Sequence, residues 1–202
     1  MRRALLACAL PFLAIGCNAV LGWDSASVDP LLEAGASGGT QCERYCAVMA
    51  ANCSGVNLKY ITPSVCVSMC SQLDPGIEGD VGGPSIACRA TYAAKAATED
   101  PVVNCERAGP LTAGPCNDDP CRAFCTLDVS YCPMAYKDAD ACVATCDTLK
   151  STYDPSLQIA GDQQRNTLNC RLYHLQAAFV NSNAQMVHCM HTSAKNLVCS
   201  GT

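Results

Sequence analysis

Two stretches of the chain decide its fold: CERYCAVMAANC at residues 42–53 and CRAFCTLDVSYC at residues 121–132. In each stretch the second cysteine follows the first by four residues and the third follows the second by seven, and an aromatic residue precedes the second cysteine. Steps of four and seven residues bring side chains to one face of an α-helix. Both stretches are therefore predicted to be helices that carry a stripe of cysteines.

Outward from these stretches, the cysteines form two groups of eight. The steps between them are 4, 7, 13, 4, 18, 17 and 11 in the first group and 4, 7, 10, 4, 24, 19 and 10 in the second. Such self-similarity is typical of an internal duplication. We predict two tandem repeats, residues 42–117 and 118–202. The first group is Cys42, Cys46, Cys53, Cys66, Cys70, Cys88, Cys105 and Cys116, and the second is Cys121, Cys125, Cys132, Cys142, Cys146, Cys170, Cys189 and Cys199.

These sixteen cysteines are predicted to form disulfides. Metal ligation is the competing interpretation, but the sequence has no C-x-x-C and no C-x-x-C-H motif, which zinc ribbons, thioredoxin-type redox pairs and c-type haem sites would need. Even numbers of cysteines in an exported chain indicate a disulfide framework. Aromatic residues make up 5% of the chain, so such cross-links would replace part of a bulky apolar core.

Helix signals place the cysteines on an all-α framework. Thr40 and Glu43 form a capping-box pattern that starts a helix over about 41–53, and Thr62 with Pro63 opens a second helix that ends near Pro75. Asp119 and Asp138 mark equivalent helix starts in the second repeat. Two facing C-x3-C helices predict four bridges, namely Cys42–Cys70, Cys46–Cys66, Cys121–Cys146 and Cys125–Cys142.

The rest of each repeat is predicted to be a third helix, at about 85–98 and 164–181, followed by an irregular C-terminal segment. Both third helices are rich in alanine and lack proline and glycine. The remaining bridges are less constrained, since eight cysteines admit 105 pairings. The pairs that we expect are Cys53–Cys88, Cys105–Cys116, Cys132–Cys170 and Cys189–Cys199.

The N-terminus carries an export signal. Arg2 and Arg3 precede an apolar run over 4–15, which is too short to span a bilayer as a helix. Residues 13–17, LAIGC, resemble the bacterial lipobox, which implies removal of residues 1–16 (with Cys8) and acylation of Cys17. The alternative is an ordinary signal peptide that is cleaved nearby; twin-arginine export is a poor match. Acyl chains on Cys17 would anchor the protein to a lipid bilayer.

Residues 17–41 then form the lipidated cysteine and a flexible tether, with the Gly- and Ser-containing run 34–39. The chain has 18 acidic and 13 basic residues and no basic cluster beyond the two N-terminal arginines. Nucleic acid, which requires grouped positive charge, is therefore excluded as an expected partner. The expected location is the cell envelope, lipid-anchored, in the outer membrane of a Gram-negative bacterium.

Several segments resemble the cysteine-rich repeats of uncharacterised lipoproteins from myxobacteria. These are Tyr45-Cys46 with Cys53-Ser54-Gly55, the stretch NTLNCRLYH at residues 166–174, and HCMH at residues 188–191. The resemblance covers roughly residues 42–199 and implies an exported protein, without implying an activity.

All three histidines of the chain, His174, His188 and His191, lie in the second repeat. His188 and His191 are three residues apart, which puts both imidazoles on one helical face, and His174 lies one turn beyond Cys170. The three could converge, with Met190 as a nearby soft ligand, to bind copper, zinc or haem iron. The alternative is that they are solvated or hydrogen-bonded histidines without a ligand.

The sequence contains no catalytic motif. There is no Gly-x-Ser-x-Gly, and GDVGG at residues 79–83 indicates a turn before a helix rather than a phosphate loop. We therefore expect that the protein is not an enzyme and needs no cofactor. Our first hypothesis is an envelope lipoprotein whose disulfide-stapled scaffold binds another envelope or surface protein or has a structural role. The alternative is a metal- or haem-binding envelope protein that uses the three histidines.

Overall fold

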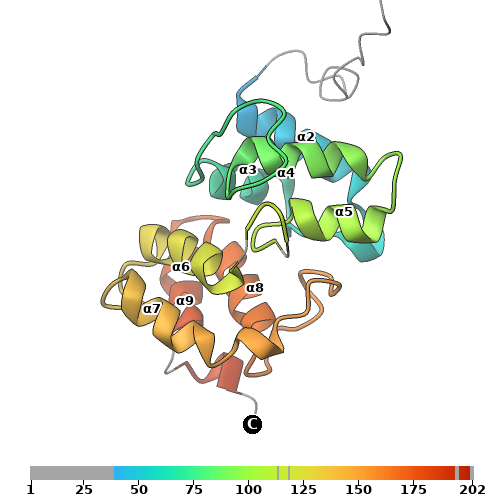
Figure 1. Cartoon of the computed structure of the whole chain (residues 1–202). Helices are drawn as coiled ribbons and strands as arrows, with labels where there is room; N and C mark the ends of the chain where they lie inside the picture. The colour runs from blue at the N-terminus through green and yellow to red at the C-terminus, as the bar shows by residue number, and fades with distance from the viewer. Residues whose placement is uncertain (1–38, 113, 118, 194–195, 201–202) are drawn as a thin grey trace, which may run out of the picture.

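The computed structural model describes residues 39–112, 114–117, 119–193 and 196–200. Within these ranges the chain forms eight α-helices and no β-strand, which confirms the all-α prediction (Figure 1). None of the helices in the described ranges has both the length and the apolar character needed to cross a bilayer. The predicted signal peptide, Cys17 and nearly all of the predicted tether lie outside the described residues.

The helices fall into two groups of four, which lie one above the other in Figure 1. The first group contains α2 (Gln41–Asn52), α3 (Pro63–Cys70), α4 (Ile86–Lys95) and α5 (Pro101–Ala108), with the 3-10 helix η1 (Gly55–Asn57) after α2. The second group contains α6 (Pro120–Tyr131), α7 (Ala139–Asp147), α8 (Leu168–Ala178) and α9 (Ser182–Thr192), with the 3-10 helices η2 (Lys150–Thr152) and η3 (Val198–Ser200).

The predicted helix starts are confirmed by their caps. Thr40 accepts a hydrogen bond from the backbone of Glu43, and the Glu43 carboxylate accepts one from the backbone of Thr40, so the capping box is complete. Thr62 caps α3, and Asp119 and Asp138 cap α6 and α7. Each of these side chains accepts a hydrogen bond from a first-turn N–H that would otherwise lack a partner.

The predicted irregular C-terminal segments are wrong, because each group contains a fourth helix. Asp100 caps α5 directly before Pro101, and Asn181 caps α9. The third helices are also shorter than expected. In the second group α8 begins at Leu168 rather than near 164, because Thr167 is its N-cap and the preceding residues form a loop.

The sixteen cysteines are all paired in eight disulfides. The four bridges between facing C-x3-C helices are confirmed: Cys42–Cys70, Cys46–Cys66, Cys121–Cys146 and Cys125–Cys142. The other four predicted pairs, Cys53–Cys88, Cys105–Cys116, Cys132–Cys170 and Cys189–Cys199, are wrong. The observed bridges are Cys53–Cys105, Cys88–Cys116, Cys132–Cys189 and Cys170–Cys199.

The physical reason is the fourth helix of each group. Helix α5 carries Cys105 to the C-terminal end of α2, where Cys53 is the C-cap, and α9 carries Cys189 to Cys132, the C-cap of α6. The sixth cysteine of each group then meets the eighth. Both groups therefore follow one order, first with fifth, second with fourth, third with seventh and sixth with eighth, and the two halves share one covalent framework.

The two groups of helices are joined by hydrogen bonds to a buried glutamine. The side chain of Gln176 on α8 donates to the carbonyl of Lys59 and accepts from the backbone N–H of Ile61, at 2.9 and 3.0 Å. The backbone N–H of Ile159 donates to the carbonyl of Leu58 as well. Helix α8 is thus fixed on one side by the first half of the protein, and its other side is available to α9.

Candidate metal centre

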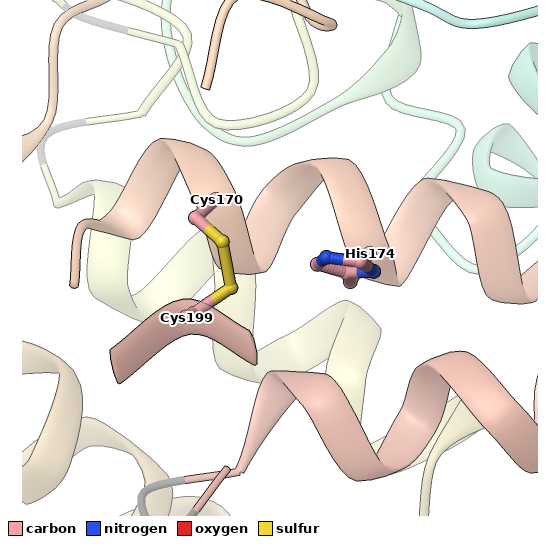
Figure 2. A group of neighbouring side chains, drawn as sticks. All are labelled: Cys170, His174 and Cys199. Carbon is pink, nitrogen blue, oxygen red and sulfur yellow. A yellow bond between two sulfur atoms is a disulfide. The ribbon is translucent and has the colours of Figure 1, made fainter. Parts of the chain in front are cut away.

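The candidate site lies between α8 and α9. Helix α8 contributes His174, one turn after Cys170, whose disulfide to Cys199 holds the start of the helix to η3 (Figure 2). Helix α9 contributes His188 and His191, on either side of Cys189, whose disulfide to Cys132 fixes the helix to α6. Both helices are therefore positioned by a cross-link within four residues of each histidine.

The three imidazoles converge, as the sequence analysis considered. The Nδ1 atom of His174 lies 2.9 Å from Nδ1 of His188 and 3.3 Å from Nδ1 of His191. Each ring also offers a nitrogen within 4.8 Å of the others. Two nitrogens bound to one tetrahedral zinc ion at about 2.0–2.1 Å are about 3.3 Å apart. The distance between His174 and His191 matches this spacing, whereas the shorter distance between His174 and His188 is that of a hydrogen bond.

The orientation of His174 is fixed by the backbone. Its Nε2 lies 3.1 Å from the carbonyl oxygen of Gln163, and because a carbonyl only accepts, Nε2 carries the proton and donates. In the neutral ring the Nδ1 atom then has a free lone pair, and that lone pair points to the other two histidines. A hydrogen bond from the distal ring nitrogen to a carbonyl is the usual support of a metal-binding histidine.

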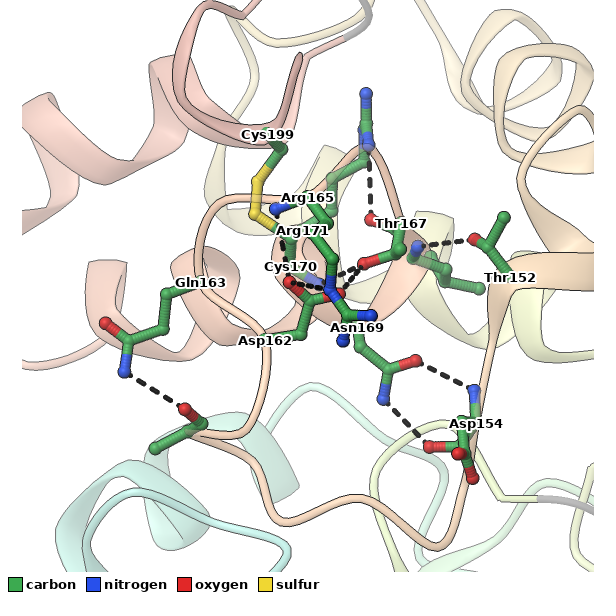
Figure 3. Close-up of polar contacts among 12 residues, drawn as sticks. Thr152, Asp154, Asp162, Gln163, Arg165, Thr167, Asn169, Cys170, Arg171 and Cys199 are labelled. Atoms are coloured by element: carbon green, nitrogen blue, oxygen red, sulfur yellow. Dashed lines mark hydrogen bonds and ion pairs between the residues drawn. A yellow bond between two sulfur atoms is a disulfide. The ribbon is translucent and has the colours of Figure 1, made fainter. Parts of the chain in front are cut away.

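A polar network holds the loop that supplies this carbonyl (Figure 3). The buried carboxylate of Asp162 accepts hydrogen bonds from the Thr167 hydroxyl and the backbone N–H of Arg165. The side chain of Asn169 accepts from the backbone N–H of Asp154 at 2.8 Å and donates to its carbonyl at 2.9 Å. The loop before α8 is therefore tied to Asn169 in the first turn and to the N-cap Thr167, and Gln163 directly follows the second of these ties.

The environment favours the neutral form of the three rings. Burial and the two neighbouring histidines lower the pKa of His174 to about 4, against the opposing hydrogen bond to Gln163. Burial also lowers the pKa of His188 and of His191. Transition-metal ions bind the neutral imidazole, so none of the three rings has to lose a proton to bind one.

Both ring nitrogens of His174 have a partner: Nε2 donates to the Gln163 carbonyl, and Nδ1 can accept a hydrogen bond from a neighbouring histidine. If Nδ1 of His174 accepts a hydrogen bond, only one lone pair is available there, yet both His188 and His191 approach that atom. His174 is 6% exposed, so water has little access to its ring. A single cation could also take the lone pairs of the three rings, so the group is compatible with metal binding as well as with a hydrogen-bonded cluster.

Two other groups in the described residues contain potential ligands, but neither is available. Cys170 and Cys199 lie near His174, yet both sulfurs are in a disulfide and offer no thiolate (Figure 2). Asp119 and Asp147 lie near Cys121, which is also oxidised, and the Asp119 carboxylate is paired with Lys150 at 3.1 Å. Among these groups, only the three histidines have an available ligand atom on every member.

Met190, which the sequence analysis considered as a soft ligand, is exposed. It lines a pocket beside His191, together with Met134 and Met186. The sequence does not predict this pocket, because Met134 comes from the loop after α6, far from α9 in the chain. The role of Gln163 is not predictable either, since nothing in a sequence shows which carbonyl will face a histidine.

No protein-family model, curated protein or solved structure matches this chain. The site must therefore be interpreted from its own geometry.

Proposed function

We propose that this chain is an exported, lipid-anchored protein of the cell envelope that binds one transition-metal ion through His174, His188 and His191. The observation that carries the proposal is the convergence of three Nδ1 atoms, with 2.9 and 3.3 Å between His174 and its two neighbours. Our sequence-based hypotheses put a scaffold for another envelope protein first and metal binding second, and this geometry reverses that order.

The class of ligand follows from the donor set. Three neutral imidazoles suit zinc or copper and leave a coordination position open for water or a further ligand. A haem iron fits less well, because two axial ligands approach from opposite faces and lie about 4 Å apart, and a third imidazole would have no position. We therefore propose a single mononuclear ion rather than haem.

The chain offers an unusually clean test, since these three histidines are the only ones it has. We expect the purified full-length chain, with its disulfides intact, to bind one equivalent of Zn²⁺ or Cu²⁺ in a calorimetric titration. His174→Ala should weaken binding at least about a hundredfold, because it removes the central ligand.

His188→Ala and His191→Ala serve as a second test, since these rings are less buried and their loss is less damaging to folding. Asp147→Asn is the matched control, because Asp147 belongs to the group whose cysteine is oxidised. Stoichiometric binding that survives all three histidine substitutions in folded protein would refute the proposal.

Anchoring at Cys17 is a separate part of the proposal. It is supported by the lipobox resemblance of residues 13–17 and by sixteen paired cysteines, which fit an oxidising compartment. Cys17→Ser should release the protein from the membrane fraction on expression in a Gram-negative host and remove the mass of the acyl chains. A variant that stays in the membrane fraction would contradict lipid anchoring without affecting the metal proposal.

A further inference from the structure

A pocket of about 740 Å³ lies next to the three histidines. Its wall comes from the end of α6 and the loop that follows, from α9, and from the segment before η3. His191 belongs both to this wall and to the histidine group. The pocket and the proposed metal centre are therefore neighbouring parts of one region.

The pocket collects the exposed methionines of the described residues. Met49 and Met69 are buried in the first half, whereas Met134, Met186 and Met190 are 93%, 70% and 62% exposed and all line the pocket. Three thioethers that face solvent at one place are not explained by packing, because packing would bury them.

A disulfide keeps the three methionines together. Met134 is two residues after Cys132, and Met186 and Met190 are three residues before and one residue after Cys189. The Cys132–Cys189 bridge, with 5.2 Å between its Cα atoms, forms part of the pocket wall and joins the two segments. The side chain of Gln185 also donates to the carbonyl of Tyr131, at 2.7 Å. A disulfide and a hydrogen bond therefore hold together the two segments that carry the methionines.

The chemistry of the wall favours a soft ion of low charge. No aspartate, glutamate, lysine or arginine lines the pocket, so it lacks the carboxylates that hard cations require. Thioether sulfur is a soft ligand that selects Cu(I), and imidazole also binds copper. We propose that the methionine pocket, defined as Met134, Met186 and Met190 with His191 at its edge, is a capture site for Cu(I).

The proposal deepens the proposed function, because it names copper as the ion and gives it a route to the site. Cu(I) binds first to the thioethers, and His191 then connects the pocket to His174 and His188. The ion keeps its oxidation state, so no electron donor or acceptor is involved. The proposal that Cu(I) binds the methionines depends only on the pocket. The proposal that the ion then moves to the three histidines also depends on the proposed function.

Ag(I) is a suitable probe, since it is a soft monovalent ion that does not change oxidation state on handling. The test variant is Met134→Leu with Met186→Leu and Met190→Leu in the full-length chain, which keeps apolar side chains of similar size and removes all three sulfurs. The control is Met49→Leu with Met69→Leu, which removes two buried sulfurs away from the pocket. Competition titrations give the Ag(I) and Zn²⁺ affinities of each protein.

We expect the pocket variant to bind Ag(I) at least tenfold more weakly, with unchanged Zn²⁺ affinity, and the control to match the unsubstituted protein. Equal Ag(I) affinity of the pocket variant and the unsubstituted protein would overturn the capture site. The pocket would then be better explained as a site for an apolar molecule, because leucine side chains would preserve the binding of such a molecule. The proposed function is tested by Zn²⁺ binding in the histidine variants, and the capture site is tested by Ag(I) binding in the pocket variant. Each of the two proposals can therefore fail without the other. A pocket variant that also loses Zn²⁺ binding would overturn the separation of the two sites.

Discussion

The helix pair α4–α5 in the first half and the pair α8–α9 in the second have the same covalent framework and different side chains. At the positions of His174, His188 and His191, counted from the nearest cysteine, the first half has Tyr92, Asn104 and Arg107. There the guanidinium of Arg107 lies 5.3 Å from the centre of the Tyr92 ring, and Lys95 lies 5.2 Å from it. In the first half, the positively charged side chains of Arg107 and Lys95 thus lie in the region that corresponds to the proposed metal site of the second half.

The methionine pocket has no counterpart in the first half either. The positions equivalent to Met134, Met186 and Met190 hold Gly55, Val102 and Glu106. Both differences include residues within three positions of the bridge between the third and the seventh cysteine, and Tyr92 and His174 follow the sixth. The two halves thus combine one order of disulfides with different side chains at equivalent positions.

The largest expected effect comes from moving the histidines into the first half. Tyr92→His, Asn104→His and Arg107→His together should raise the binding stoichiometry from one to two equivalents of Zn²⁺, because Cys88 and Cys105 hold α4 and α5 as Cys170 and Cys189 hold α8 and α9. Calorimetry on the full-length chain measures this number. Tyr92→His alone is the control and should leave it at one.

A triple variant that folds, forms eight disulfides by mass and still binds one equivalent would break the comparison. It would mean that the support of His174 by the Gln163 carbonyl, rather than the cysteine framework, determines binding.

The second effect separates stability from binding with a matched pair of disulfides. Cys88–Cys116 and Cys170–Cys199 span 28 and 29 residues, so replacing either pair by serine should cost a similar free energy of unfolding, about 2–5 kcal/mol. Only the second change should weaken Zn²⁺ binding as well, because it frees the start of α8, which carries His174. Chemical denaturation and titration of both variants distinguish the two roles.

If both variants lost metal affinity equally, the site would depend on global stability rather than on its nearest bridge.

The smallest effect concerns Asp128, which stands where the first half has Met49. Its side chain is fully buried and neither carboxylate oxygen has a hydrogen-bond partner. Burial raises its pKa from 3.8 to about 7. The unfolded chain therefore loses this proton at lower pH than the folded chain does, and stability falls as the pH rises from about 4 to 7.

Asp128→Met should increase the free energy of unfolding by about 1–3 kcal/mol at pH 8, since it removes a buried carboxylate without partners. The gain should shrink toward about pH 3, which is below the pKa of 3.8 in the unfolded chain, because the carboxyl is then protonated in both states. Urea denaturation at both pH values measures it. A gain of equal size at the two values would show that packing rather than ionisation is responsible.

Local patterns were enough to predict the first two helices of each half and their bridges. Capping residues such as Thr40 and Asp138 mark helix starts within a few residues. When two C-x3-C helices pack antiparallel, the two outer cysteines pair with each other and so do the two inner ones. The fourth helices, which Asp100 and Asn181 cap, were not predicted. Their place depends on the long-range bridges Cys53–Cys105 and Cys132–Cys189, which local pattern does not determine.

The histidine group could be predicted only in part. The spacing of His188 and His191 within HCMH indicates a shared face, whereas the approach of His174 depends on the packing of α8 against α9. The Gln163 carbonyl and the pocket at Met134 depend on loops and on the correct pairing of Cys132, which local pattern does not determine.

The disulfide order has a consequence for biogenesis. No bridge crosses from residues 42–116 to residues 121–199, so each half closes its four bridges among its own eight cysteines. Sixteen thiols that mixed freely would have about two million pairings, whereas two closed sets have 105 each. Under the export that we propose, the first half can finish its oxidation before the second half is exported, and each half then searches only its own 105 pairings.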